Sequence, residues 1–183
     1  DWGLEDLMTF HIIGQPGVFF RRSALEKAGP LDLSYHFLLD HHLWLRLAQT
    51  GEMAYIPQPL AAARYHAEAK NIAQASRFGE EAYRIVAWMA TQPGLAERLP
   101  RLRRKVWAGA HRFNGRYLLD GGQPGAAFSS YLRSLAAYPA TALGEWHRML
   151  YALLSLAGLG RLKPLFYRLR HTVRKWRNPE VYH

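Results

Sequence analysis

The chain has 183 residues, of which 49% are hydrophobic and 21% are charged. This composition is ordinary for a soluble globular protein and too apolar for a disordered one, and the length suffices for one domain or one and a half. The absence of Cys excludes disulfides and thiolate metal sites, and it leaves the cellular compartment open.

The net charge of +10 is unevenly distributed along the chain. Residues 1–79 contain seven Lys/Arg and eight Asp/Glu, whereas residues 80–183 contain 17 and six. We therefore expect two units with different partners, over residues 1–75 and 76–183. Because residue 1 is Asp and no basic-then-apolar signal segment follows it, we expect the chain to be part of a longer protein.

The first unit has the pattern of a mixed α/β structure. Strands are expected where aromatic, β-branched and other apolar residues gather, over residues 17–22, 53–56 and 61–65. Ser23 followed by Glu26 is typical of a capping box, which predicts a short helix over residues 24–28.

A second helix is expected from Asp40 to Gly51, because apolar residues recur there at helical spacing. Asp40 at its start suits an N-cap, since a carboxylate accepts hydrogen bonds from the first free N–H groups. A metal site with His41 and His42 is less favoured, because adjacent helical residues point about 100° apart and lack the i, i+4 spacing of paired ligands. We expect both histidines to be exposed. A carboxylate held at a helix start also suits a catalytic base, so capping and catalysis are compatible.

Five segments, in order between about residues 10 and 72, resemble the second half of a family 2 glycosyltransferase with a GT-A fold. They are Gln15–Arg22, Leu25–Asp32, Asp40–Arg46, Pro57–His66 and Lys70. The third is similar to the family signature Asp-Tyr-Asp-Leu-Trp-Leu-Arg. The resemblance implies that residues 1–75 form part of an α/β GT-A-like domain.

The same resemblance implies an inverting glycosyltransferase that moves a sugar from a nucleotide-sugar donor to a glycan or lipid-linked acceptor. Such an enzyme would serve cell-envelope or extracellular polysaccharide synthesis. Asp40 would be the general base that deprotonates the acceptor hydroxyl. Arg64, His66 and Lys70 would contact the donor diphosphate or the metal, and Gln15 would line the acceptor side. The alternatives are a solvated basic loop for the first three and a structural role for Gln15.

The sequence departs from the family pattern at two positions and lacks one half of the fold. Leu39 stands where many members have Glu, and His42 stands where many have Asp. No Asp-x-Asp motif is present, so we expect the divalent metal (Mg or Mn) of the complete enzyme to be bound mainly by the missing half. We assign no metal ligand in this chain and expect it to be inactive alone. Trp44 is expected in the core and Arg46 in packing or an internal ion pair.

The second unit is predicted to be all helix. Helices are expected over residues 80–90, 98–118 and 124–138, with breaks at Pro and Gly. Residues 108–119 and 124–138 resemble one tetratricopeptide-like hairpin, with small residues where the helices cross and Gly in the turn. One pair is not an array, so we interpret the unit as a helical extension packed on the first.

The C-terminal segment combines apolar and basic residues. Its longest uncharged run, residues 149–160, is too short to span a bilayer. Residues 161–177 carry seven basic residues and no acidic one, so residues 146–177 have the composition of a helix lying on an anionic membrane surface. The alternative is an ordinary amphipathic helix packed on the domain. We expect a cytoplasmic protein, peripheral at the inner face of the membrane.

Nucleic acid is not expected as a partner, because no recognised nucleic-acid-binding motif is present. Two other function classes compete with the glycosyltransferase. One is a noncatalytic helical-repeat interaction module, and the other is a basic membrane- or nucleic-acid-binding protein.

Overall fold

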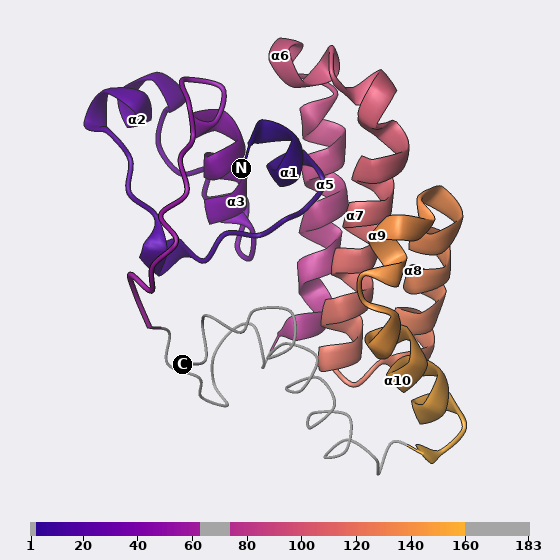
Figure 1. Ribbon diagram of the computed structural model, residues 1–183. Helices are drawn as coiled ribbons and strands as arrows, with labels where there is room; N and C mark the ends of the chain where they lie inside the picture. The colour runs from indigo at the N-terminus through magenta and orange to yellow at the C-terminus, as the bar shows by residue number, and fades with distance from the viewer. Residues whose placement is uncertain (1–2, 63–73, 160–183) are drawn as a thin grey trace.

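The computed structural model describes residues 3–62 and 74–159, which form helices joined by loops (Figure 1). Within these two ranges no β-strand occurs. The α-helices are α1 (Leu4–Met8), α2 (Arg22–Ala28), α3 (Leu39–Leu47), α5 (Phe78–Met89), α6 (Pro93–Ala96), α7 (Leu99–Asp120), α8 (Pro124–Ala137), α9 (Pro139–Leu143) and α10 (Trp146–Leu156). Two short 3-10 helices are η1 (Gln15–Gly17) and η2 (Ala75–Arg77).

The expected α/β GT-A-like domain is therefore wrong, and the described residues form an all-α structure. The predicted strand at residues 17–22 contains extended backbone at Val18 and Arg21, but no described segment pairs with it. Residues 53–56 likewise pair with no part of the chain that the structure describes, and the predicted strand at 61–65 lies mostly outside the described residues. A strand needs a partner for its backbone groups, and apolar composition alone does not supply one.

The predicted helix at residues 24–28 is confirmed as part of α2, but the predicted capping box is wrong. The helix begins one residue before Ser23, at Arg22, and no side chain caps it. Glu26 instead accepts a hydrogen bond from Arg22 Nε at 3.0 Å. Gly29 ends the helix with a φ of 79°, a left-handed conformation that favours glycine.

The predicted helix at Asp40 is confirmed as α3, but the predicted N-cap role of Asp40 is wrong, because no side chain caps this helix. Leu38 is the N-cap, and Asp40 is the second residue of the helix. The buried carboxylate of Glu81, on α5, accepts the backbone N–H groups of residues 36–38 at 2.7, 2.8 and 2.8 Å. Glu81 therefore satisfies donors ahead of α3 and fastens this helix to α5.

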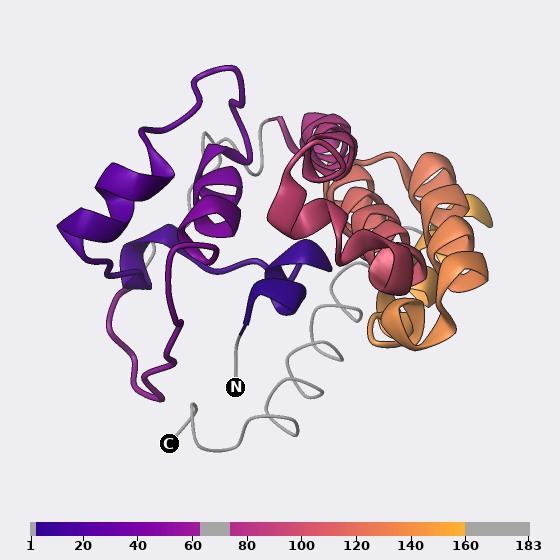
Figure 2. The same ribbon diagram turned by 90° about the horizontal axis from the view of Figure 1, so that it is seen from above.

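The helices predicted in the second unit are confirmed as α5, α7 and α8, and α7 and α8 form the expected hairpin. Gly122 occupies the turn between them with a φ of 76°. A Cβ on Gly115 would lie 3.1 Å from the ring of Tyr131, and Ser134 donates a hydrogen bond to the Ala108 carbonyl at 2.8 Å. Small residues thus let the two helices approach closely, side by side (Figures 1 and 2).

One hydrophobic core joins the N-terminal segment to the helices that follow. Leu7, Met8 and Phe10 are buried together with residues of α3, α5 and α7. Gly109 of α7 marks the closest approach, because a Cβ there would lie 2.1 Å from the Thr9 carbonyl oxygen. The segment that follows α1 therefore lies directly on the backbone of α7. No helix among the described residues is long and apolar enough to cross a membrane.

Candidate functional site

A cavity of about 570 Å³ lies where three parts of the chain meet. Its size falls within the range of small-molecule sites. The N-terminal segment contributes Glu5, Asp6, Thr9 and His11, and α7 contributes Leu102, Lys105, Arg112 and Arg116. The region from the end of α8 to the start of α10 contributes Tyr138, Ala140, Thr141, Gly144 and Glu145.

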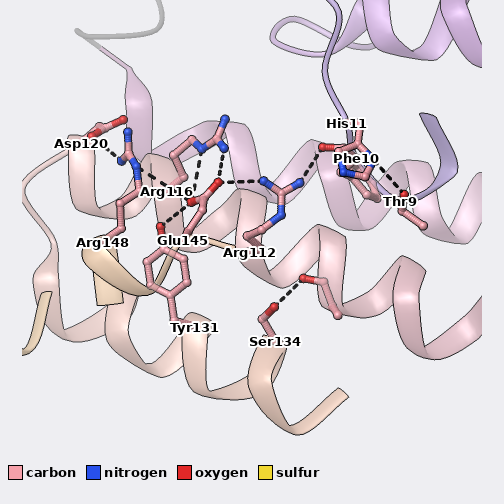
Figure 3. A network of polar contacts seen from close by, with 11 residues as sticks. Thr9, Phe10, His11, Arg112, Arg116, Asp120, Tyr131, Ser134, Glu145 and Arg148 are labelled. Carbon is pink, nitrogen blue, oxygen red and sulfur yellow. Dashed lines mark hydrogen bonds and ion pairs between the residues drawn. The ribbon is translucent and has the colours of Figure 1, made fainter. Parts of the chain in front are cut away.

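The buried carboxylate of Glu145 organises one side of the cavity (Figure 3). It accepts hydrogen bonds from Arg112 Nη1 at 2.8 Å, from the Tyr131 hydroxyl at 3.1 Å and from Arg116. The other terminal nitrogen of Arg112, Nη2, donates to the Phe10 carbonyl at 2.8 Å. This network connects the N-terminal segment, α7, α8 and α10 through buried charged groups.

The network determines which of its members are charged. Burial alone would raise the pKa of Glu145, but the guanidinium groups of Arg116 and Arg112 outweigh burial and lower this pKa to about 2. Burial would lower the pKa of Arg116, and Glu145 outweighs it and raises this pKa. Burial and the Glu145 charge raise the pKa of Tyr131 well above its usual value. At neutral pH the carboxylate is therefore ionised and the phenol is protonated.

The network contains more cations than anions. Arg148 of α10 is buried, with its Nη1 3.0 Å from Asp120 Oδ1 and its Nε 3.9 Å from Glu145 Oε2. Three guanidinium groups, those of Arg112, Arg116 and Arg148, thus share two carboxylates. The network has a net charge of +1 before the cavity's Lys105 is counted.

The opposite wall of the cavity carries acidic groups that already have partners. Glu5 lies 3.6 Å from Arg98 Nη1 and forms an ion pair with Arg101. Asp6 Oδ2 accepts the Gly3 N–H at 2.9 Å, and its Oδ1 lies 3.6 Å from His11 Nδ1. The negative charge of Glu5 is therefore offset by two guanidinium groups, whereas Asp6 is hydrogen-bonded to the backbone.

Two cations on the α7 wall have N–H groups that can still bind a ligand. The Lys105 ammonium lies 5.4 Å from the centre of the Tyr138 ring, and no described carboxylate is within 4.0 Å of it. Arg116 directs Nε and Nη2 to Glu145, and no acceptor for its Nη1 is found within the described ranges. The side chain of Arg116 is 34% exposed, so it reaches both the network and the cavity.

The residues predicted from sequence do not form this site. Asp40 is partly buried in α3, where its Oδ1 accepts the His41 N–H at 2.7 Å. Burial raises the pKa of Asp40, and the hydrogen bonds from the backbone oppose this only in part. Gln15 is exposed in η1, and neither it nor Asp40 lines the cavity. Arg64, His66 and Lys70 lie outside the described residues.

The other side chains around Asp40 have packing roles. Trp44 is buried, as predicted, and lies 6.0 Å from the ring of Phe20. Arg46 donates to the Ala28 and Pro30 carbonyls at 2.8 and 2.7 Å, which confirms a packing role. His41 and His42 were predicted to be exposed, and both are buried. His42 stacks on Tyr35 at 4.5 Å and meets Trp88 edge-on at 4.3 Å.

No group of three or more His, Cys, Asp or Glu within residues 3–62 and 74–159 is placed to hold a metal ion. The cavity network was missed in the sequence, although two signals pointed to it. Lys105, Arg112 and Arg116 are spaced seven and four residues apart, which places three cations on one face of the predicted helix. Glu145 is the only acidic residue between Asp120 and Glu180 in a strongly basic stretch.

No protein-family model, curated protein or solved structure matches this chain. The expected membership of the family 2 glycosyltransferases is contradicted by the helical architecture of the described residues, which contain none of the strands that the GT-A fold requires.

Proposed function

We propose that this chain is a noncatalytic helical binding module whose cavity takes up a small anionic molecule bearing a phosphate or carboxylate group. The proposal rests on a difference between the two walls of the cavity in how far their charged groups are already paired within the protein. On the acidic wall Glu5 is paired with Arg98 and Arg101, whereas the α7 wall offers Lys105 and the outer donors of Arg116.

The chemistry of the α7 wall suits an anion for two reasons. Hydrogen bonds from an ionised donor to an anion are about twice as strong as those between neutral groups. In addition, Glu145 holds the guanidinium groups of Arg112 and Arg116 in place, so little side-chain ordering remains to oppose binding. The ring of Tyr138 and the apolar side chain of Leu102 offer contact area for the rest of the ligand.

Isothermal titration calorimetry with inorganic phosphate and with citrate tests this proposal. Lys105→Gln removes one ligand cation, and we expect it to weaken anion binding by about tenfold, the loss of one charge-assisted contact. Arg103→Gln is the matched control, because Arg103 is an exposed cation of the same helix that does not line the cavity. The phosphate and citrate arms identify the preferred anion. Equal losses in the two variants, or no binding of either anion by the unchanged protein, would overturn the proposal.

A role in inverting glycosyl transfer is a second candidate, and the position of Asp40 favours it. Its carboxylate is partly buried at the start of α3, and its raised pKa makes it a stronger base than an exposed aspartate. In this alternative the donor is a nucleotide-sugar, the acceptor is a glycan or lipid-linked molecule, and Mg or Mn binds mainly outside this chain.

Asp40→Asn in the complete protein tests the second candidate. We expect sugar transfer to be lost and nucleotide binding to stay nearly unchanged, because the base acts on the acceptor hydroxyl. Gln15→Ala, at an exposed position, should weaken acceptor binding if Gln15 contacts the acceptor. It should leave acceptor binding unchanged if the role of Gln15 is structural. Transfer at the normal rate by the Asp40→Asn variant would remove Asp40 from any such mechanism.

A further inference from the structure

Helix α10 exposes an apolar stripe that no described residue covers. Trp146, Leu150, Leu153 and Leu156 are 48%, 46%, 47% and 52% exposed, and their spacings of four, three and three residues place them on one face of the helix. Leu143 before the helix and Leu159 after it are exposed as well. The stripe is defined as these six residues.

The opposite face of α10 holds the helix on the protein. Ala152 is fully buried and belongs to a cluster with Leu119, Ala127 and Tyr131. The only Lys, Arg, Asp or Glu in the helix, Arg148, is buried on this inner side with Asp120. The exposed stripe therefore contains no charged side chain. Figure 1 shows α10 at the outer edge of the bundle, below α8 and α9.

The sequence that follows the stripe is strongly basic. Residues 160–183 contain seven Lys/Arg and one Glu. An apolar face that is followed in the sequence by many cations is complementary to an anionic lipid surface, where acyl chains accept the apolar groups and headgroups accept the cations. A helix of 11 residues is too short to cross a bilayer, so a membrane-bound α10 would lie in the plane of the interface.

We propose that the stripe on α10 inserts into the interface of an anionic lipid bilayer. The occupant is the lipid surface itself, and the basic segment after residue 159 draws α10 toward the headgroups. This inference uses no residue of the cavity, so it stands or falls separately from the proposed anion binding.

Flotation of the whole chain with lipid vesicles tests the proposal. We expect binding to vesicles of phosphatidylcholine with about a third phosphatidylserine, and at least about tenfold weaker binding to phosphatidylcholine alone. Added salt should weaken binding only in part, because salt screens the charges and leaves the apolar contribution intact.

The triple variant Leu150→Ser, Leu153→Ser and Leu156→Ser removes the centre of the stripe. It should lose at least about tenfold in vesicle affinity, since the three leucines supply much of the apolar surface that would enter the lipid. Leu33→Ser is the control, because Leu33 is 76% exposed in the loop after α2. Circular dichroism of each variant confirms that the helices persist. Equal vesicle binding by the triple variant and the unchanged protein, or binding to duplex DNA and not to vesicles, would overturn the proposal.

Discussion

Glu145→Gln is the sharpest perturbation of the buried charge network. The variant keeps an acceptor oxygen but removes the negative charge that faces Arg112, Arg116 and Arg148. Removing one partner of a buried ion pair costs about 3 to 5 kcal/mol, because the remaining charge stays buried and uncompensated. Independently, the lowering of the Glu145 pKa from 4.5 to about 2 on folding corresponds to about 3 kcal/mol of stabilisation of the folded state at neutral pH. We therefore expect the free energy of unfolding to fall by about 3 kcal/mol.

Urea denaturation at pH 7, followed by circular dichroism, measures this change. Glu26→Gln is the control, because Glu26 forms an exposed ion pair with Arg22 at 3.0 Å, and it should change stability by less than about 0.5 kcal/mol. A loss below about 1 kcal/mol for Glu145→Gln would refute the argument that the network stabilises the fold.

The pH dependence of the same variant provides a second check. The folded-state pKa of Glu145 lies below its unfolded value, so its stabilisation is complete above about pH 4.5 and is lost as the pH falls toward 2. The stability difference between the unchanged protein and Glu145→Gln should therefore shrink across this window. A difference that stays constant from pH 5 to pH 2 would contradict the assigned charge state.

Three further predictions concern the contacts that position the cavity. Gly109→Ala should destabilise the fold by about 2 kcal/mol in thermal denaturation, because the added Cβ would lie 2.1 Å from the Thr9 carbonyl oxygen. Gly17→Ala is the control and should be far milder, because open space surrounds Gly17. Burial lowers the pKa of His41 from 6.5 to about 4, so the free energy of unfolding should fall by about 3 kcal/mol as the pH drops from 6.5 to 4. His41→Leu should remove this part of the fall. The same dependence of unfolding free energy on pH in the variant would contradict the prediction. Glu81→Gln should lower the free energy of unfolding by about 2 kcal/mol and speed hydrogen exchange at the backbone amides of residues 36–38. Unchanged exchange would show that these amides have another acceptor.

Local patterns predicted the helices of the second unit well. Helix α7 and helix α8 have apolar residues at helical spacing, a Gly-containing turn and Pro at or near their starts, and these signals need no distant partner. The strands were wrong because a strand depends on a neighbour. Phe19 is 78% exposed and Tyr55 is 67% exposed, and the segments that contain them are loops that pair with no other described residues.

The sites depended on contacts between residues far apart in the sequence. Helix α3 was correctly placed, but Asp40 does not cap it, and Glu81, more than 40 residues later, accepts the backbone N–H groups of residues 36–38 ahead of the helix. The pairing of Arg112 with Glu145 spans 33 residues and requires α8 to return along α7. Such pairings follow from the tertiary arrangement, and a spacing pattern within one helix does not reveal them.

Arginine side-chain NMR during a phosphate titration shows whether an anion binds on the α7 wall of the cavity, as proposed above. Each Nε–Hε group gives its own signal, so the position of the anion can be followed residue by residue. We predict saturable shifts for Arg112 and Arg116, with Arg103 unchanged. Shifts of equal size at all three residues, or no saturable shift at Arg116, would contradict the account.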